Sequence, residues 1–121
     1  MAGHRNVIAW QKAIELAVAC YDTSVTLRRA RHTDLSGQLL RASVSVPTNI
    51  AEGHGRGTDR DFARCLDISM GSLREVETLI ELAARLHVIK QETTSELLKQ
   101  ADEVGRVLFG LRRSKRPPGQ C

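Results

Sequence analysis

Apolar residues recur three and four positions apart along most of the chain, which is the spacing of a helix that buries one stripe of its surface. No window shows sustained alternation of apolar and polar residues between turn residues, so no strand is predicted. We expect helices over residues of about 7–30, 35–53, 59–87 and 94–112. Short connections between them favour an all-α, antiparallel up-down-up-down four-helix bundle over residues 1–111, followed by a basic flexible tail over 112–121.

The apolar stripes of the first two helices define the faces that we expect to be buried. They comprise Val7, Trp10, Ile14, Ala17, Tyr21 and Val25 in the first helix and Leu35, Leu39, Ala42, Val46 and Ile50 in the second. Thr33 or Asp34 is expected to cap the second helix. Because the apolar spacing continues in register across Pro47, we favour a kinked second helix over two shorter helices that meet there. A glycine-rich run over residues 53–57 should end it.

The third helix carries the clearest pattern. Thr58 to Asp61 resembles a capping box, with Asp in place of the usual Glu. A heptad seam follows, formed by Phe62, Leu66, Ser69, Leu73, Val76, Ile80 and Ala83, and a flanking row is formed by Cys65, Ser72, Leu79 and Leu86. We therefore expect the longest helix of the protein, buried on two sides, with Gly71 marking a close approach of another helix. The apolar positions of the fourth helix are Leu97, Ala101, Val104, Leu108 and Leu111.

The composition limits the function classes. At 121 residues the chain is one domain, which excludes an enzyme with separate cofactor and substrate domains. With 41% hydrophobic and 26% charged residues it is typical of a soluble globular protein, and we expect neither a membrane span nor a signal peptide. Aromatic residues make up 3%, which argues against a protein that stacks successive bases on exposed rings. Three cysteines at wide spacings favour free thiols and a cytoplasmic location.

Charge is distributed unevenly along the chain. The net charge is +4, yet residues 57–103 carry an excess of acids, whereas residues 1–56 and 104–121 carry an excess of bases. The basic clusters are Arg28, Arg29 and Arg31 at the end of the first helix and Arg112, Arg113, Lys115 and Arg116 at the end of the fourth. Either cluster alone is typical of the last turn of a helix, where cations complement the helix dipole. In an up-down-up-down bundle the two clusters should lie at opposite ends of a protomer. In a ring of identical chains each cluster would repeat around a rim, where several phosphate contacts add up.

Two further arginines adjoin the glycine-rich run. No strand precedes residues 53–57, as it would in a nucleotide-binding loop, so we interpret this segment as a helix terminator and turn. Arg56 and Arg60 flank the predicted N-terminus of the third helix, where free N–H groups favour a phosphate of a nucleic-acid backbone. They join the two basic clusters as candidate nucleic-acid-binding residues.

A row of polar residues follows one side of the second helix. It comprises Gln38, Arg41, Ser45, Asn49, Glu52 and Arg56. Such a row is typical of a solvated helix face. The alternative is a polar lining or a subunit interface, in which Asn49 and Glu52 satisfy backbone groups freed by Pro47 or bind a neighbouring chain. On that interpretation Gln38, Arg41 and Ser45 are interface residues as well.

No residues form a recognisable catalytic or metal-binding set. His4, His32, His54 and His87 are scattered, with neither an H-E-x-x-H motif nor a second His one helical turn away, so we assign no metal ligand, no cofactor and no catalytic residue. The best enzymatic alternative is a helical-bundle ribonuclease. Such enzymes pair an Arg with a His a few residues later, and Arg28 with His32 does not match that spacing.

Several segments together carry a family resemblance. They are Trp10–Ala13, Gln38, Arg41–Gly53, Gly55, Arg56, Phe62, Leu66, Gly71–Leu73, Glu75 and Glu77. The first resembles the first-helix signature, and Gln38 with Arg41–Gly53 resembles the central motif, of the four-helix-bundle family named for proteins encoded by intervening sequences in bacterial 23S rRNA genes. The resemblance covers residues 7 to about 111, which is nearly the whole chain.

The resemblance implies a small cytoplasmic bundle without established enzymatic activity that assembles as a homo-oligomer, with pentameric rings known in the family. Related accessory proteins of diversity-generating retroelements have a basic ring surface and bind nucleic acid and a reverse transcriptase. The expected partners are therefore further copies of the chain, rRNA or another nucleic acid, and a reverse transcriptase, but no membrane. Our leading hypothesis is a non-enzymatic homo-oligomer that binds nucleic acid through a repeated basic surface. The alternative is an assembly or adaptor module that binds none.

Overall fold

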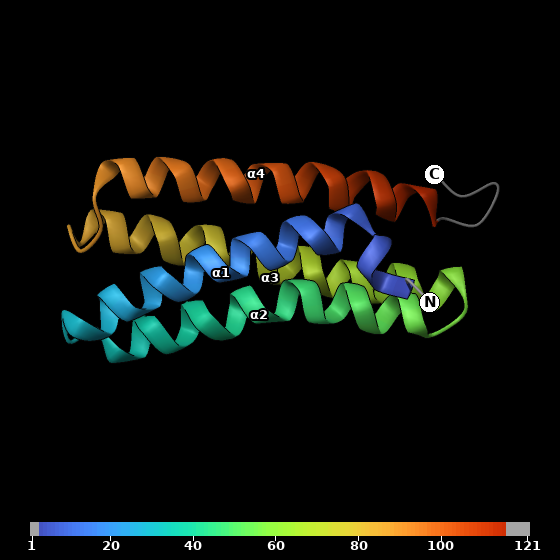
Figure 1. Cartoon of the computed structure of the whole chain (residues 1–121), viewed down its shortest axis with the longest axis horizontal. Coiled ribbons are helices and arrows are strands. Elements are labelled where there is room, and N and C mark those ends of the chain that lie inside the picture. Colours follow the sequence, from blue (N-terminus) through green and yellow to red (C-terminus); the bar gives the residue numbers. More distant parts are fainter. Residues whose placement is uncertain (1–2, 116–121) are drawn as a thin grey trace.

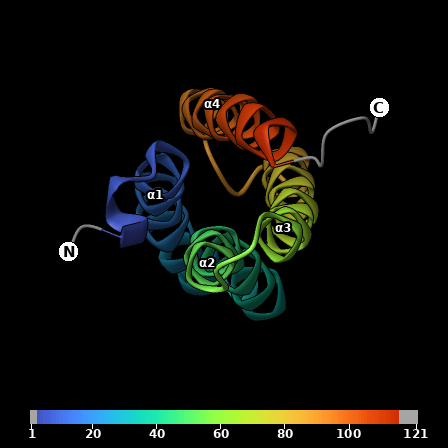
Figure 2. The same cartoon turned by 90° about the vertical axis from the view of Figure 1, so that its right-hand side faces the viewer.

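Within residues 3–115, which the computed structural model describes, a short 3-10 helix precedes four α-helices. They are η1 (Gly3–Asn6), α1 (Ile8–Arg29), α2 (Thr33–Gly55), α3 (Asp59–Arg85) and α4 (Gln91–Ser114). Consecutive α-helices run antiparallel (Figure 1), and the view along the bundle shows them in chain order around a common core, with α4 beside α1 (Figure 2). The expected up-down-up-down four-helix bundle is confirmed.

The buried face of α1 is not the predicted one. Its buried residues are Ala9, Ala13, Leu16, Cys20, Thr23, Ser24 and Leu27. The predicted stripe lies one residue further along, so it is turned by about 100° around the helix. In that stripe Ile14 is 36% exposed and Tyr21 is 53% exposed. Buried Ser24 has a role at the contact with α2, because its carbonyl oxygen accepts a hydrogen bond from Ser36 Oγ at 2.7 Å.

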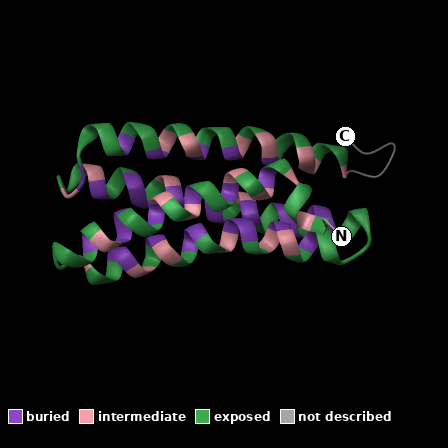
Figure 3. Ribbon diagram, in the orientation of Figure 1, coloured by how far each residue is buried: buried purple, intermediate pink, exposed green. Residues whose placement is uncertain are grey.

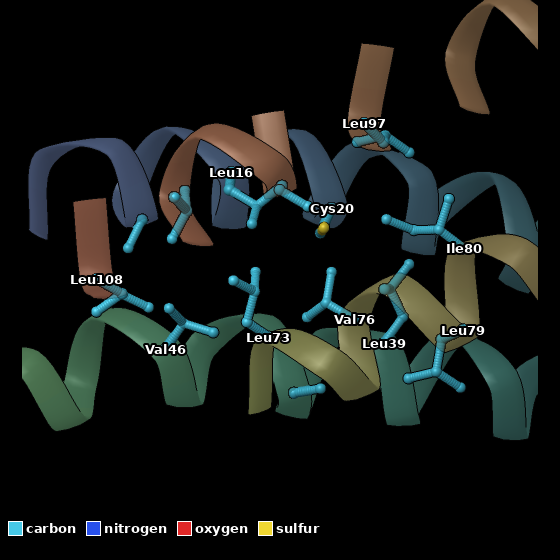
Figure 4. Close-up of a cluster of buried hydrophobic side chains, with 14 of the residues drawn as sticks. Leu16, Cys20, Leu39, Val46, Leu73, Val76, Leu79, Ile80, Leu97 and Leu108 are labelled. Atoms are coloured by element: carbon cyan, nitrogen blue, oxygen red, sulfur yellow. The ribbon is translucent and has the colours of Figure 1, made fainter. Parts of the chain in front are cut away.

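The stripes predicted for α2, α3 and α4 do form the core (Figure 3). The α2 stripe and the heptad seam of α3 are buried throughout, and in α4 Leu111 alone of its stripe is partly exposed. Core side chains drawn from all four helices include Leu16, Cys20, Leu39, Val46, Leu73, Val76, Ile80, Leu97 and Leu108 (Figure 4). Burial raises the pKa of Cys20 to about 12, so its thiol stays protonated and unreactive at neutral pH. Leu86 was expected in the flanking row, but it is 48% exposed at the C-cap position of α3.

Helix α2 continues through Pro47 as one helix, as the in-register spacing predicts. Proline lacks an N–H and so cannot donate to the carbonyl four residues earlier. Side chains donate hydrogen bonds to the next three carbonyls, which follow the Ser43 carbonyl that Pro47 leaves without its usual donor. Asn49 Nδ2 donates to the Ser45 carbonyl at 2.9 Å, and Ser69 Oγ of α3 donates to the Val46 carbonyl at 2.8 Å. Thr48 Oγ1 donates to the carbonyl of Val44 at 2.7 Å.

The close approach of two helices occurs at Gly53 and not at Gly71. A Cβ atom added to Gly53 would lie 2.7 Å from Cys65 Cβ and 2.9 Å from Phe62 Cδ1. A Cβ atom on Gly71 would meet no atom of another residue within 4 Å beyond its own helical surroundings, so the predicted packing role of Gly71 is wrong. Gly53 therefore lets α2 pack against the first turns of α3.

The starts of α2 and α3 differ in how they are capped. Helix α2 begins at Thr33, so His32 takes the N-cap position and the predicted cap by Thr33 or Asp34 is wrong. Thr58 caps α3 as expected, because its Oγ1 accepts a hydrogen bond from the Asp61 N–H at 3.1 Å.

Helix α4 is longer than predicted at both ends. It begins at Gln91 and continues to Ser114. Arg112 and Arg113, expected at the start of a flexible tail, therefore lie in the last helical turn. The part of that predicted tail beyond Lys115, including Arg116, lies outside the described residues.

Candidate nucleic-acid and assembly surfaces

The end of α1 presents an exposed arginine cluster. Arg28 and Arg29 lie in the last turn, where the helix dipole stabilises cations, and Arg31 follows in the left-handed conformation with φ 70°. All three side chains are exposed. Among the described residues, no carboxylate oxygen lies within 4.0 Å of their side-chain nitrogens. Their charges are therefore available to an external anion.

The opposite end of the bundle brings Arg56 and Arg60 to the C-terminus of α4 (Figure 1). Lys115 Nζ lies 3.7 Å from Asp59 Oδ1 and 5.4 Å from the centroid of the Phe62 ring, which fixes the end of α4 against the start of α3. The two predicted basic clusters thus lie at opposite ends of the protomer, and Arg56 and Arg60 share the end with the second cluster.

Among the described candidate residues at this second end, Arg56, Arg112 and Lys115 are held by carboxylates of the same chain, whereas Arg60 and Arg113 are not. Arg112 makes two hydrogen bonds to Asp67, at 2.7 and 3.2 Å, and Arg56 pairs with Glu52 one turn earlier. The hydrogen bond to each carboxylate raises the pKa of the arginine above its usual value. These pairs leave less charge for an external phosphate than the unpaired cluster at the end of α1.

The polar row of α2 faces α3 and is partly used within the chain. Ser45 Oγ accepts hydrogen bonds from Ser72 Oγ at 2.8 Å and from Asn49 Nδ2 at 3.0 Å. Gln38 and Arg41 remain exposed and line a cleft of about 310 Å³ together with Ala42, Ser45, Ser72 and Glu75. The middle of the row therefore joins α2 to α3, whereas Gln38 and Arg41 are open to a partner.

Exposed apolar side chains form a second kind of surface, which the sequence pattern did not identify. On α1 they are Ile14, Val18 and Tyr21, with Val44 on neighbouring α2, and at the end of α3 they are Leu82 and Leu86. Each is between 36% and 60% exposed. The signal for the first group was present, since α1 carries two apolar stripes at helical spacing and one helix face cannot bury both.

Neither a metal centre nor a membrane span is found in the part of the chain that the structure describes. No three His, Cys, Asp or Glu side chains there converge on a position that would hold a metal ion. None of the helices over residues 3–115 combines the length and apolar character that crossing a bilayer requires.

His32 is half-buried and lines a cleft of about 430 Å³ between the start of α2 and the end of α3. The other residues that line this cleft include Arg31, Asp34, Gln38, Leu79, Leu82 and Leu86.

Comparison with known proteins places the chain among its relatives. The sequence profile of the family described as 23S rRNA-intervening sequence protein matches residues 5–110. No curated protein matches the chain. A crystal structure of a protein of unknown function from the S23 ribosomal protein family of Bacteroides thetaiotaomicron is similar in fold, with a TM-score of 0.83 and 24% identity over 87% of this chain and 98% of that one. Neither description names an enzymatic reaction. The extent of the profile match shows that the chain belongs to the 23S rRNA-intervening sequence protein family.

Proposed function

We propose that this protein is a non-enzymatic, homo-oligomeric four-helix bundle of the cytoplasm that binds RNA or another nucleic acid through arginines repeated around the assembly. The observation that carries the proposal is the cluster of Arg28, Arg29 and Arg31, exposed at one end of the bundle without a carboxylate partner among the described residues. Arginines in such a cluster neutralise phosphates and release the counterions bound to them. The buried free thiols of Cys20 and Cys65 favour the reducing cytoplasm.

The exposed apolar side chains support the homo-oligomeric part of the proposal. Monomeric soluble proteins seldom gather large apolar side chains on their surface, and such surfaces mark contacts with partners. Here the groups on α1–α2 and on α3 differ from each other in residues and position. A contact between two different surfaces of identical chains is head-to-tail and closes into a ring when the rotation allows. Each ring position would add one arginine cluster to the same rim.

The test of nucleic-acid binding is a salt titration with a short RNA duplex. We expect affinity to fall steeply between about 50 and 200 mM salt, and replacing Arg28, Arg29 and Arg31 together by Ala to reduce the slope of log K against log salt by about 0.9 per lost phosphate contact. A matched control replaces Arg5, Arg64 and Lys99 by Ala, which removes the same charge outside both clusters from exposed residues that also lack a carboxylate partner among the described residues. Equal slopes for the two triple variants, or no binding by the wild-type protein, would contradict the proposal.

An assembly or adaptor module without nucleic-acid binding is the second candidate. The same exposed apolar side chains favour it, together with the open positions of Gln38 and Arg41 beside α3. This function predicts an oligomer whose mass is unchanged by added RNA at low salt. The duplex titration therefore separates the two candidates, because only the first requires an RNA complex.

A further inference from the structure

Phe109 is an exposed aromatic ring with open space beside it. Its side chain, on the outer part of α4, is 51% exposed. It borders a hollow of about 230 Å³ between α3 and α4, together with Gly105 one turn earlier and Met70 across the groove. Side chains on a helix lean toward its N-terminus, so the ring leans toward the position of Gly105, where no side chain covers it.

Two ion pairs line this hollow. Arg74 is hydrogen-bonded to Glu77 at 2.7 Å on α3, and Arg106 is hydrogen-bonded to Asp102 at 2.6 Å on α4. The guanidinium carbon of Arg113 lies 5.9 Å from the centroid of the Phe109 ring. That distance is near the limit of a useful cation–π attraction, so a flat group that stacks on the ring would displace only a weak contact with Arg113.

We propose that Phe109 is a stacking platform for one unpaired base of a single-stranded nucleic acid, with Arg113, which has no carboxylate partner among the described residues, binding the adjacent phosphate. This inference rests on the proposed nucleic-acid function and names its substrate class. A base has an apolar face that matches the ring, and the anionic backbone next to it matches Arg113; stacking of this kind does not depend on sequence. A duplex offers the phosphates without the free base, since its bases are stacked on one another.

A single platform per chain fits the low aromatic content. With 3% aromatic residues the chain has no series of rings on which successive bases could stack. Copies of the platform in a homo-oligomer would instead hold bases at intervals along one strand. The Phe109 site is separate from Arg28, Arg29 and Arg31, which lie at the opposite end of the bundle (Figure 1). Those three arginines would bind the phosphate backbone of a single strand and of a duplex alike.

The experiment compares binding of an oligouridine strand, whose bases are largely unstacked, with binding of an RNA duplex of equal length. We expect Phe109→Ala to weaken binding of the strand by about 5-fold or more and to leave duplex affinity unchanged. Phe109→Trp should bind the strand at least as well as wild type. Ile8→Ala is the matched control, because Ile8 is 59% exposed at the start of α1, outside the hollow and both apolar groups, and should change neither affinity.

Two results would overturn the platform while leaving the proposed function intact. One is wild-type affinity of Phe109→Ala for the strand, and the other is an equal loss for strand and duplex. A change in the sedimentation mass of Phe109→Ala without a selective loss of strand binding would assign the ring to a subunit contact instead. Failure of the wild-type protein to bind either RNA would overturn both the platform and the proposed function.

Discussion

Gly53 lies where α2 packs against the start of α3, with no room for a methyl group. In an open helix, alanine in place of glycine is stabilising by up to about 1 kcal/mol. At Gly53 the added Cβ would overlap the Cβ atom of Cys65, and the backbone atoms of two packed helices would have to move apart. We expect Gly53→Ala to lower the free energy of unfolding by about 1–3 kcal/mol, the usual cost of overpacking a core.

Gly71→Ala is the control for this prediction, measured by urea unfolding. It lies in the interior of α3, where an added Cβ meets open space, and should raise the free energy of unfolding by about 0.5–1 kcal/mol. A stabilised Gly53→Ala would contradict the close approach. The sequence could not distinguish the two glycines, because each interrupts a helical pattern and the difference lies in what packs opposite.

At the scale of the element, the buried face of a helix was predictable where its polar and apolar sides differ sharply. In α3 the heptad seam is bordered on one side by a row of charged residues that includes Asp67, Arg74 and Glu81, so the pattern identified its buried side correctly. In α1 two apolar stripes lie one residue apart, and the stripe with the larger side chains was the wrong choice. The small residues Ala9 and Ala13 are buried, while Val18 and Tyr21 remain exposed. Periodicity gives the spacing of a stripe, and only the neighbouring helices decide which stripe they cover.

At the start of α3 the sequence correctly predicted the capping residue, Thr58. Thr58 Oγ1 accepts the Asp61 N–H, which would otherwise lack a partner at the helix start. We expect Thr58→Ala to lower the free energy of unfolding by about 0.5–2 kcal/mol, whereas Thr58→Ser should retain most of the stability because serine offers the same oxygen. Thermal or urea unfolding measures both. Equal losses for the two variants would show that the Thr58 methyl group, and not the hydroxyl, stabilises this end.

At the scale of the whole molecule, the arginine clusters were visible in the sequence and their separation followed from the up-down topology. The carboxylates that hold Arg112 and Lys115 were not predictable, because Asp67 and Asp59 come from another helix and meet them only in the folded bundle. The exposed apolar groups were missed for a related reason. Part of each group, such as Tyr21, belonged to a row that was predicted to be buried, and the remaining residues are hydrophobic residues of a kind that is ordinary in a sequence. Only their exposure in the folded bundle marks a contact surface.

A head-to-tail contact between the apolar groups makes a specific prediction about mixtures of variants. Val18→Lys with Tyr21→Lys disables the α1 surface, and Leu82→Lys with Leu86→Lys disables the α3 surface. All four side chains are 47–60% exposed, so the protomers should still fold. Each variant alone should sediment as the 13.4 kDa protomer.

Mixed in equal amounts, the two variants should form a species of twice that mass and nothing larger. One variant contributes an intact α3 surface and the other an intact α1 surface, and both remaining surfaces are blocked. If the apolar groups instead paired like with like, each variant alone would still dimerise through its intact surface and mixing would change nothing. Circular dichroism of each variant confirms the helical fold, so that a monomer reports loss of contact and not unfolding.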